Sequence, residues 1–396
     1  MKKTGVIENG MVITPSKTIE NGVVVFEDGK ITAVGQKNRV EVPRSAKVID
    51  ASGKIVAPGF IDIHVHGGEG RDVMDASYEA IKDMAKFLVS HGTTSFVPTT
   101  ISAPRSDLLR AVRAVKTAME KGTDGAEVLG AHLEGPYINH EKRGAHDAKY
   151  FRLPSIDELE EIWEASNCAV RIVTLAPELE GSKMLIQRLR ELGIVASIGH
   201  SNATYTQAVD AMKHGVRHVT HMFNRMSGFD PREPGVVGAV LVHDELTAEL
   251  ICDGIHVHPA AMSLLTRVKG SKKVVLVTDS IRAAGMPDGE YALGKQRIIV
   301  KDGVSRLESG DFAGSTLTMD RAVRNIVKLV GTPLETAVKM ATINPAVVVN
   351  VDGNKGSLEL GKDADIVIID KEVNVYMAIV KGNVVYRSSH RSFSNH

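Results

Sequence analysis

Histidine and carboxylate residues recur along this chain at the ends of short apolar runs. His64 and His66 end the first run, and alternate residues of a strand point to the same face, so both imidazoles can bind one metal ion. Imidazole and carboxylate suit zinc, iron, manganese or cobalt, and the set offers no thiolate. The sequence therefore predicts a site for one or two divalent metal ions. Its candidate ligands are His64, His66, Glu134, His200, His221 and Asp279.

Such a site predicts hydrolysis. A bound divalent metal lowers the pKa of water toward neutrality and so supplies hydroxide. Asp279 is placed to take the proton of this hydroxide and to return it to the leaving group. Each residue also has a plainer interpretation on its own: the His-x-His pair can be incidental, and Asp279 and Ser280 can both cap the following helix. The joint occurrence at equivalent positions favours the metal site.

The candidate ligands need a scaffold that brings distant strand ends together. Short apolar runs alternate with helical patterns between residues 58 and 349, which predicts a (β/α)8 barrel of the TIM type. Active sites of such barrels lie at the carboxyl ends of the strands. The runs cover residues 60–67, 93–100, 128–135, 170–178, 194–201, 218–224, 247–258 and 273–280.

The two ends of the chain have a different pattern. Residues 1–57 and 350–396 contain short β-branched runs separated by Asn-Gly and Asp-Gly turns. Neither end has enough strands for a stable core, so we expect one small β-sandwich domain built from both termini. Residues 290–316 predict a β-hairpin insertion after the eighth strand of the barrel.

The composition excludes several classes of protein. The 48 basic and 48 acidic residues among 396 give no net charge, which argues against a broad nucleic-acid or membrane-binding surface. No apolar run approaches the ~20 residues of a membrane-spanning helix. The N-terminus lacks the apolar segment of a signal peptide. Only two cysteines are present, which favours a reducing compartment, and we expect a cytoplasmic protein.

A set of short motifs lies along the predicted barrel. The motifs are, in order, PGFIDIHVHGG, HLEGPYI, RGAH, TLAPE, GHSNA, HMFNRMS, REPG, DGIHVHP, VTDS and AGSTLTM. Together and in this order they resemble the amidohydrolase superfamily and, within it, the N-acetylglucosamine-6-phosphate deacetylases. The resemblance covers nearly the whole chain, including the split β domain, and it implies metal-dependent hydrolysis of a linear amide.

The resemblance implies roles for the candidate ligands. Glu134, His200 and His221 correspond to the residues that hold the principal metal, and Glu134 takes the place of a carboxylated lysine that bridges two metals in many relatives. Some family members lack the first histidine motif and use one metal. This chain keeps His64 and His66, which implies a second ion.

The resemblance also implies which residues contact the substrate. Asp279 is implied as general base and then acid, and His256 as a catalytic residue near the acetamide or the sugar. His146 is implied to contact the substrate in the same way. The implied substrate-binding residues are Ala145, His146, Asn224, Arg225, Arg232, His256, Phe312, Ala313 and Gly314.

Two arginines bear on the recognition of a phosphate group, because a guanidinium can donate two hydrogen bonds to phosphate oxygens. Arg232 matches a family arginine that reaches the active site of the neighbouring subunit, which implies a homodimer; a solvated loop arginine is the alternative. Arg225 departs from the family, which usually has a small residue after the asparagine. Either its backbone alone is used or its side chain adds a second cation.

The function implied by the resemblance is hydrolysis of N-acetylglucosamine 6-phosphate to glucosamine 6-phosphate and acetate, in amino-sugar catabolism and cell-wall sugar recycling. The alternative enzyme is another metal-dependent amidohydrolase that acts on a different N-acyl amino sugar or on a cyclic amide. A catalytically silent barrel that serves as a binding protein is the alternative of a different class. The complete set of candidate ligands argues against the silent barrel.

Overall fold

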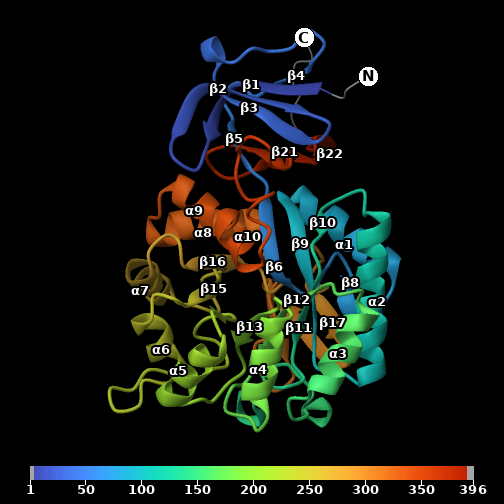
Figure 1. The fold of residues 1–396 in the computed structure, drawn as a ribbon, viewed down its shortest axis with the longest axis vertical. Helices are drawn as coiled ribbons and strands as arrows, with labels where there is room; N and C mark the ends of the chain where they lie inside the picture. Colours follow the sequence, from blue (N-terminus) through green and yellow to red (C-terminus); the bar gives the residue numbers. More distant parts are fainter. Residues whose placement is uncertain (1–3, 390–396) are drawn as a thin grey trace.

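The computed structural model describes residues 4–389 and has two parts, which Figure 1 shows one above the other. The upper part is a β module made from both ends of the chain, and the lower part is a barrel of strands and helices. Residues 1–3 and 390–396, the outermost ends of the predicted β domain, lie outside the described residues. The domain boundaries at residues 57 and 350 stay a prediction.

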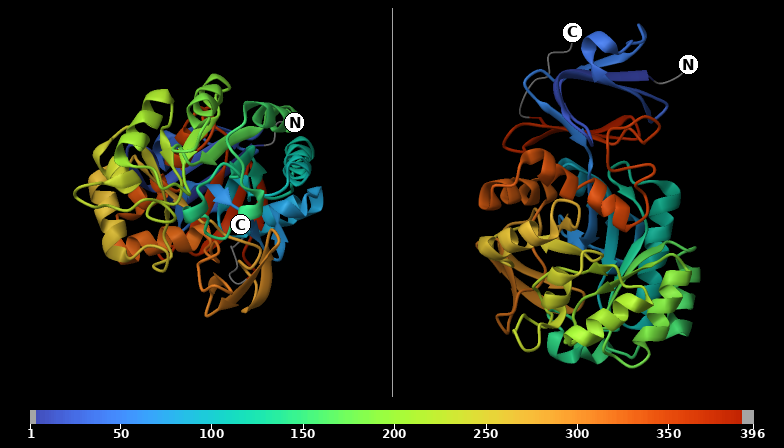
Figure 2. Two further views of the ribbon diagram at one scale, coloured as in Figure 1. Left: turned by 90° about the horizontal axis from the view of Figure 1, so that it is seen from below. Right: turned by 60° about the vertical axis from the view of Figure 1, so that its left-hand side comes forward.

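The β module joins the first and last strands of the chain in one hydrogen-bonded sheet. The order is β22-β21-β20-β5-β1-β2-β3, with β4 paired to β1. Figures 1 and 2 show β21 and β22 beneath β1 to β3, so the two ends of the sheet form two layers. Val24, Ile368 and Met377 meet in the core between them. The strands are β1 (Thr4–Ile13), β2 (Thr18–Glu27), β3 (Lys30–Gln36), β4 (Lys47–Asp50), β5 (Ile55–Pro58), β20 (Ile366–Ile369), β21 (Val375–Val380) and β22 (Asn383–Arg387).

The barrel strands run parallel to one another, and each predicted apolar run contains one of them. The barrel closes between its first and last strands, where the amide of Asp279 donates to the carbonyl of His64 at 2.8 Å. The predicted (β/α)8 barrel is therefore confirmed. The strands are β6 (Phe60–Val65), β9 (Thr93–Thr100), β10 (Glu127–Val128), β11 (Ala131–Glu134), β12 (Val170–Leu175), β13 (Val195–Ile198), β14 (His218–Val219), β15 (Thr247–Ile251) and β16 (Val274–Val277).

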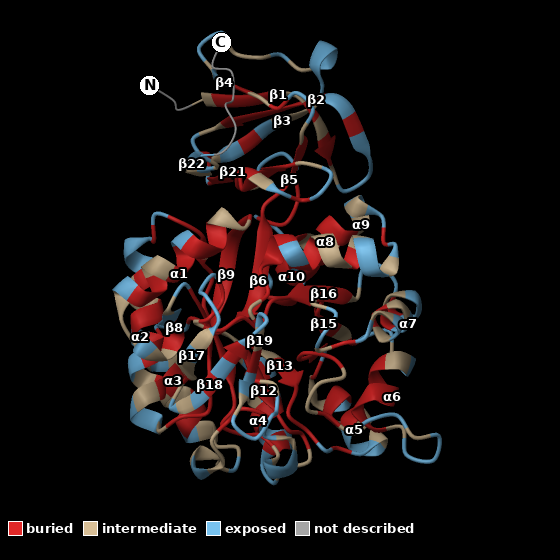
Figure 3. Ribbon diagram, turned by 180° about the vertical axis from the view of Figure 1, so that it is seen from behind, coloured by how far each residue is buried: buried red, intermediate tan, exposed pale blue. Residues whose placement is uncertain are grey.

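Helices surround these strands, as the view from below in Figure 2 shows. Their buried faces pack on the strands, while exposed residues lie on their outer faces in Figure 3. Side chains cap several N-termini: Ser77 accepts from the backbone of α1, and Thr204 forms a capping box with Gln207 in α5. The helices are α1 (Tyr78–Ser90), α2 (Arg105–Lys121), α3 (Ile156–Ala165), α4 (Ser182–Glu191), α5 (Tyr205–His214), α6 (Gly235–Val242), α7 (Pro259–Lys269), α8 (Met319–Val330), α9 (Leu334–Met340) and α10 (Ile343–Val348). Single 3-10 turns occupy Lys37–Arg39, Val73–Asp75, His140–Lys142 and Ala148–Tyr150.

The insertion after β16 is a three-stranded antiparallel sheet rather than the expected hairpin. Its strands are β17 (Gly289–Leu293), β18 (Gln296–Lys301) and β19 (Val304–Leu307). The third strand, β19, pairs with β18, and its Leu307 packs against the buried cluster that contains Ile298 and Val300 of β18. A short ribbon of β7 (Gly67–Gly68) and β8 (Arg71–Asp72) lies after the first strand of the barrel.

No helix among residues 4–389 is long and apolar enough to cross a membrane.

Candidate active site

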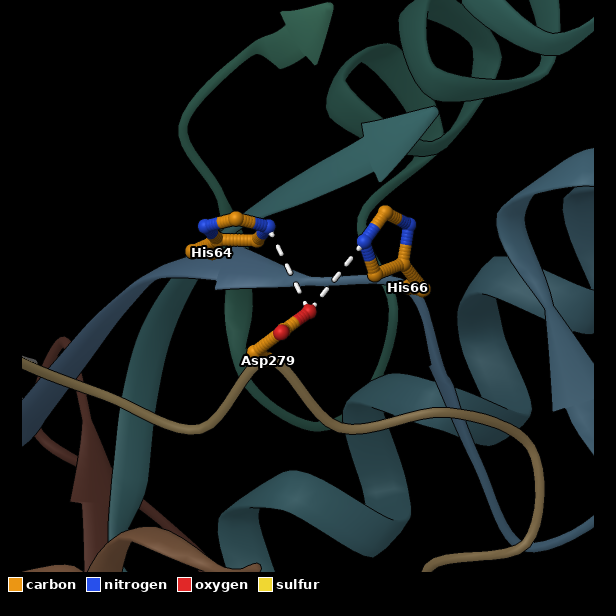
Figure 4. Close-up of side chains that lie close together, drawn as sticks. All are labelled: His64, His66 and Asp279. Atoms are coloured by element: carbon orange, nitrogen blue, oxygen red, sulfur yellow. Dashed lines mark ion pairs between the residues drawn. The ribbon is translucent and has the colours of Figure 1, made fainter. Parts of the chain in front are cut away.

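The His-x-His pair projects from the end of β6 toward one carboxylate. Nε2 of His64 lies 3.4 Å and Nε2 of His66 lies 3.3 Å from Oδ1 of Asp279, as Figure 4 shows. All three side chains are buried or nearly so. The period of a strand places the two imidazoles on one face, as predicted, and the barrel closure brings Asp279 to them.

A second cluster lies beside the first. Nε2 of His200 is 3.1 Å and Nε2 of His221 is 3.0 Å from Oε1 of Glu134. The other oxygen of this carboxylate, Oε2, is 3.2 Å from Nε2 of His66. Glu134 therefore lies between the two clusters, and the structure brings all six predicted ligands to one place.

The local backbone turns three of these side chains inward. His200, His221 and Asp279 each lie two residues beyond the end of their strand, β13, β14 and β16. Their φ angles are 49°, 30° and 49°, in the left-handed region that residues other than glycine rarely adopt. Such a conformation costs free energy and is concentrated at functional sites.

Hydrogen bonds to the protein fix which imidazole nitrogen faces the site. Nδ1 of His200 donates to the carbonyl of Lys142 at 2.7 Å, and Nδ1 of His66 donates to the carbonyl of Thr99 at 3.1 Å. Each neutral ring therefore carries its proton on Nδ1 and directs a lone pair on Nε2 into the site.

The resulting arrangement fits a metal ion. Nε2 of His200 and Nε2 of His221 lie only 3.0 Å apart, beside a carboxylate oxygen. Nε2 of His64 is buried and has no hydrogen-bond partner among residues 4–389. Nitrogen lone pairs and carboxylate oxygens that converge in a buried place are the donor set that zinc, iron, manganese and cobalt prefer. Among the described residues, the six predicted ligands form two of the four groups whose potential ligand atoms lie within 4.8 Å of one another: Glu134, His200 and His221, and His64, His66 and Asp279. His64 also belongs to a third group, with His132 and Glu249.

The imidazoles and carboxylates of the site lie close enough to shift one another's pKa values. Burial raises the pKa of Glu134, but His64, His146 and His200 outweigh it and hold that pKa well below its usual value. Burial lowers the pKa of His66, but Asp279 and Glu134 raise it to about 9, so a metal ion that binds Nε2 of His66 must displace a proton from it. The carboxylates are therefore ionised at neutral pH and provide the negative charge that a divalent cation requires.

His146 lies next to the metal-ligand clusters, but its ring carries its proton on the other nitrogen from His66 and His200. The backbone amide of Ser102 donates to its Nδ1 at 3.2 Å, so the proton of a neutral ring is on Nε2. That nitrogen is 3.3 Å from Oε2 of Glu134. Burial lowers the pKa of His146, which keeps the ring neutral. His146 is therefore placed as a hydrogen-bond donor at the site rather than as a ligand.

Most of the predicted substrate-binding residues line the cavity above these clusters. Gly314 lies close to the base of this cavity with a φ of 55°, and a Cβ there would lie 2.5 Å from the side chain of Ile281 and 3.0 Å from the carbonyl of Asp279. Only glycine fits there. The predicted residues that line the cavity are Ala145, His146, Asn224, Arg225, His256, Phe312 and Gly314.

Two predicted substrate residues lie outside this lining. Ala313 is fully buried and packs in the apolar cluster under the three-stranded insertion. The side chain of Arg232 is 87% exposed and pairs with Asp230 on the same loop, at 3.2 Å. Within one chain, Arg232 therefore does not reach the cavity.

Several residues of the site were not selected from the sequence. Glu249, fully buried on β15, bonds to His64. Asp253 bonds to Nδ1 of His256 at 2.6 Å, and Asp311 pairs with Arg225. A lone carboxylate within the apolar run of β15 was a signal for Glu249. No local pattern indicated Asp311.

The comparisons with known proteins agree with this geometry. The model of the amidohydrolase family matches residues 55–385. N-acetylglucosamine-6-phosphate deacetylase of Bacillus subtilis is 39% identical over 392 residues, 98% of each chain. N-acetylgalactosamine-6-phosphate deacetylase of Escherichia coli O157:H7 is 38% identical over 381 residues, 96% of this chain and 99% of its own.

Solved structures give the same result. A mutant N-acetyl-D-glucosamine-6-phosphate deacetylase from Mycobacterium smegmatis, in complex with N-acetyl-D-glucosamine-6-phosphate, superposes with a TM-score of 0.91 at 33% identity. The match covers 97% of this chain and 99% of that one. The deacetylase from Thermotoga maritima gives a TM-score of 0.88 at 38% identity, with 97% and 100% covered. This chain therefore belongs to the amidohydrolase family, within the branch that holds the N-acetylglucosamine-6-phosphate deacetylases.

Proposed function

We propose that this chain hydrolyses the acetamide of N-acetylglucosamine 6-phosphate and releases glucosamine 6-phosphate and acetate. The observation that carries the proposal is one cavity in which a buried cluster of imidazoles and carboxylates meets a polar rim with Asn224 and Arg225. The cluster suits the amide bond, and the rim suits an anionic sugar. The relatives whose names state this activity are similar along almost their whole length.

The metal would be held by Glu134, His200 and His221, with a second ion at His64, His66 and Asp279. Zinc or iron suits these donors best, and manganese and cobalt are the alternatives. When bound, a divalent metal supplies Lewis-acid polarisation and a lowered pKa for water at neutral pH.

Asp279 moves the proton in this proposal. Burial raises the pKa of its carboxyl, but His64 and His66 outweigh burial and lower that pKa below its usual value. The ionised carboxylate accepts a proton from the attacking water and then delivers it to the amine that leaves. His146 donates a hydrogen bond from Nε2, and His256, held by Asp253, contacts the acetamide or the sugar.

The phosphate would lie at the mouth of the cavity. Asn224 and Arg225 contact it from the same chain, and Arg232 reaches it from the neighbouring subunit of a homodimer. The exposed position of Arg232, away from its own cavity, supports a role in a second site. Both cysteines are free, which supports a reducing compartment such as the cytoplasm for this reaction.

Acetate release tests the proposal. The purified enzyme is assayed with N-acetylglucosamine 6-phosphate, with the unphosphorylated sugar, and with N-acetylgalactosamine 6-phosphate, while its metal content is measured. Strong preference for the first substrate is the expected result. The epimer is included because the E. coli relative named for it is equally similar. A metal-bound enzyme that releases acetate from none of them would overturn the proposal.

A substitution tests the assigned base. Asp279→Asn removes the proton acceptor and should lower kcat by about two to four orders of magnitude. Near-normal turnover in this variant would refute the assignment of Asp279.

A further inference from the structure

Glu249 is a buried carboxylate that the proposed reaction does not use directly. It lies within β15, is fully buried, and is surrounded by apolar neighbours on its own strand. An ionised carboxylate in such a place is costly unless hydrogen bonds satisfy it. Its oxygens accept from three groups, the ring of His64, the ring of His218 and the backbone amide of His221. Two of these three partners are candidate metal ligands.

The bond to His64 decides which nitrogen of that ring can bind a metal. Oε2 of Glu249 lies 2.8 Å from Nδ1 of His64, so the ring proton is held on Nδ1. When the ring is neutral, Nε2 presents its lone pair between Glu134 and Asp279, and this atom lies 3.5 Å and 3.4 Å from their nearest oxygens. A carboxylate behind a ligand histidine both orients the ring and raises its basicity.

The bond to His221 extends the influence of Glu249 to the other cluster. The same Oε2 atom accepts from the backbone amide of His221 at 3.0 Å. His221 has a φ of 30°, and this bond helps to hold the unusual backbone conformation that points the ring at Glu134. One carboxylate is thus bonded to one residue of each ligand group.

The remaining bond fixes Glu249 itself. Its Oε1 atom lies 3.1 Å from Nε2 of His218, and Nδ1 of His218 lies 2.7 Å from the hydroxyl of Thr247. The buried His218 and the partly buried Thr247 therefore form a chain that orients the carboxylate from the side away from the site.

The other candidate ligands have weaker support. His66 and His200 donate from Nδ1 to the backbone carbonyls of Thr99 and Lys142, which carry no net charge. Nδ1 of His221 has no partner among the described residues. Within residues 4–389, the ligand ring that has a buried carboxylate behind it is that of His64.

We propose that Glu249 is a positioning residue for metal binding, which fixes the His64 ring for the group formed with His66 and Asp279 and so determines whether that group retains a second ion. The proposal rests on the metal-dependent reaction proposed above, but its test measures metal content and does not depend on turnover.

The test compares Glu249→Gln with the unaltered chain. The amide has the shape of the carboxylate, so its oxygen can still accept from His64 and His221, while its NH2 group faces His218, which can shift its proton to Nδ1. The substitution therefore removes mainly the charge. Glu158→Gln is the matched control, because Glu158 is also buried but bonds to Tyr137 and Arg152.

The measurement is the number of zinc ions per chain across a series of buffered free zinc concentrations. The unaltered chain and the control should bind two ions, and Glu249→Gln should bind the weaker ion about 10–100-fold less tightly while it keeps the tighter one. If Glu249→Gln binds each of the two ions as tightly as the unaltered chain does, the proposal is overturned. A lower Tm with unchanged zinc affinity would also overturn it, because that result is typical of a merely structural role.

Two further outcomes distinguish a failure of the proposed role of Glu249 from a failure of the proposed deacetylation. If the unaltered chain binds one ion only, the role of Glu249 in retaining a second ion is wrong, even if deacetylation is observed. If the zinc result is as expected but no acetate is released, the proposed function fails and the role of Glu249 stands. Should Glu249→Gln not fold, nitrogen NMR of the histidine rings in the zinc-loaded unaltered chain decides, since the proposal requires the proton of His64 on Nδ1 and the zinc ion on Nε2.

Discussion

The guanidinium of Arg225, a residue that lines the cavity, lies 2.8 Å from the carboxylate of Asp311. Arg225 lies in the loop after β14, whereas Asp311 belongs to the loop after β19, in which Phe312 lines the cavity. Phe312 in turn lies 4.8 Å from the ring of His256. The ion pair therefore joins the loop after β14 to the loop after β19, beside the cavity that Arg225 and Phe312 line.

Arg225 offers a direct test of phosphate recognition. Its side chain lines the cavity, so we expect it to contact an anionic substrate and not only through its backbone. Arg225→Ala should raise KM for N-acetylglucosamine 6-phosphate about tenfold, since a charge-assisted hydrogen bond contributes about 1.5–3 kcal/mol and this one is partly solvated. Steady-state kinetics measure the effect. The unphosphorylated sugar serves as control, and an equal rise in KM for both sugars would argue that Arg225 only supports the loop.

Arg232 can be tested by mixing two defective chains. Arg232→Ala should raise KM strongly, and Asp279→Asn should abolish turnover. In a mixed dimer, the site with an intact Asp279 receives an intact Arg232 from the other chain. Co-expression of the two variants with different tags, followed by purification of the mixed species, should therefore restore turnover at low substrate concentration. No recovery in a verified mixed dimer would show that Arg232 does not act between subunits.

Asp253 is expected to control the orientation of His256. Its Oδ2 accepts from Nδ1 of His256 at 2.6 Å, and its Oδ1 accepts from the backbone amides of Ile255 and His256. Asp253→Asn removes the charged acceptor, and we expect kcat/KM to fall about 10–100-fold. Metal content should stay unchanged, because these bonds involve none of the six candidate ligands. Loss of metal in this variant would contradict the separation of the two roles.

Lys355 is expected to be important for stability rather than for catalysis. Its buried ammonium lies 2.7 Å from Glu127 of the barrel and 2.9 and 2.6 Å from Asp363 and Asp365 of the C-terminal segment. Burial lowers the pKa of Lys355, but Asp365 and Glu127 outweigh burial and raise it. Lys355→Met leaves three carboxylates without this cation and should lower the free energy of unfolding by about 3–5 kcal/mol at pH 7.

Urea denaturation measures this loss, and Lys381→Met is the matched control. Lys381 pairs with the same Glu127 but is half exposed, so its removal should cost less than about 1 kcal/mol. Burial already raises the pKa of Asp365. Without Lys355 that pKa rises further, so the stability of the variant should be greater at pH 5 than at pH 7. Equal losses in the two variants would refute the importance of the buried cation.

The sequence alone determined the fold and the chemistry of the ligands. Strand and helix periods are local properties, and each of the eight apolar runs contains a barrel strand because burial within a parallel sheet requires continuous apolar segments. The ligands could be selected for a related reason. A histidine or carboxylate at the end of an apolar run points into the active face of a barrel wherever that run becomes a strand.

Only the tertiary structure decided the partners of those ligands. Glu249 bonds to His64 across 185 positions of sequence, and Arg225 meets Asp311 across 86. Leu307, on the third strand of the insertion, likewise packs against a buried cluster that includes Ile101, far away in the sequence. Contacts of this kind depend on barrel closure and on left-handed backbone at His200, His221 and Asp279, which no local pattern specifies. The residue types thus determine which chemistry is available, and long-range packing decides which nitrogen, oxygen or guanidinium is in place to carry it out.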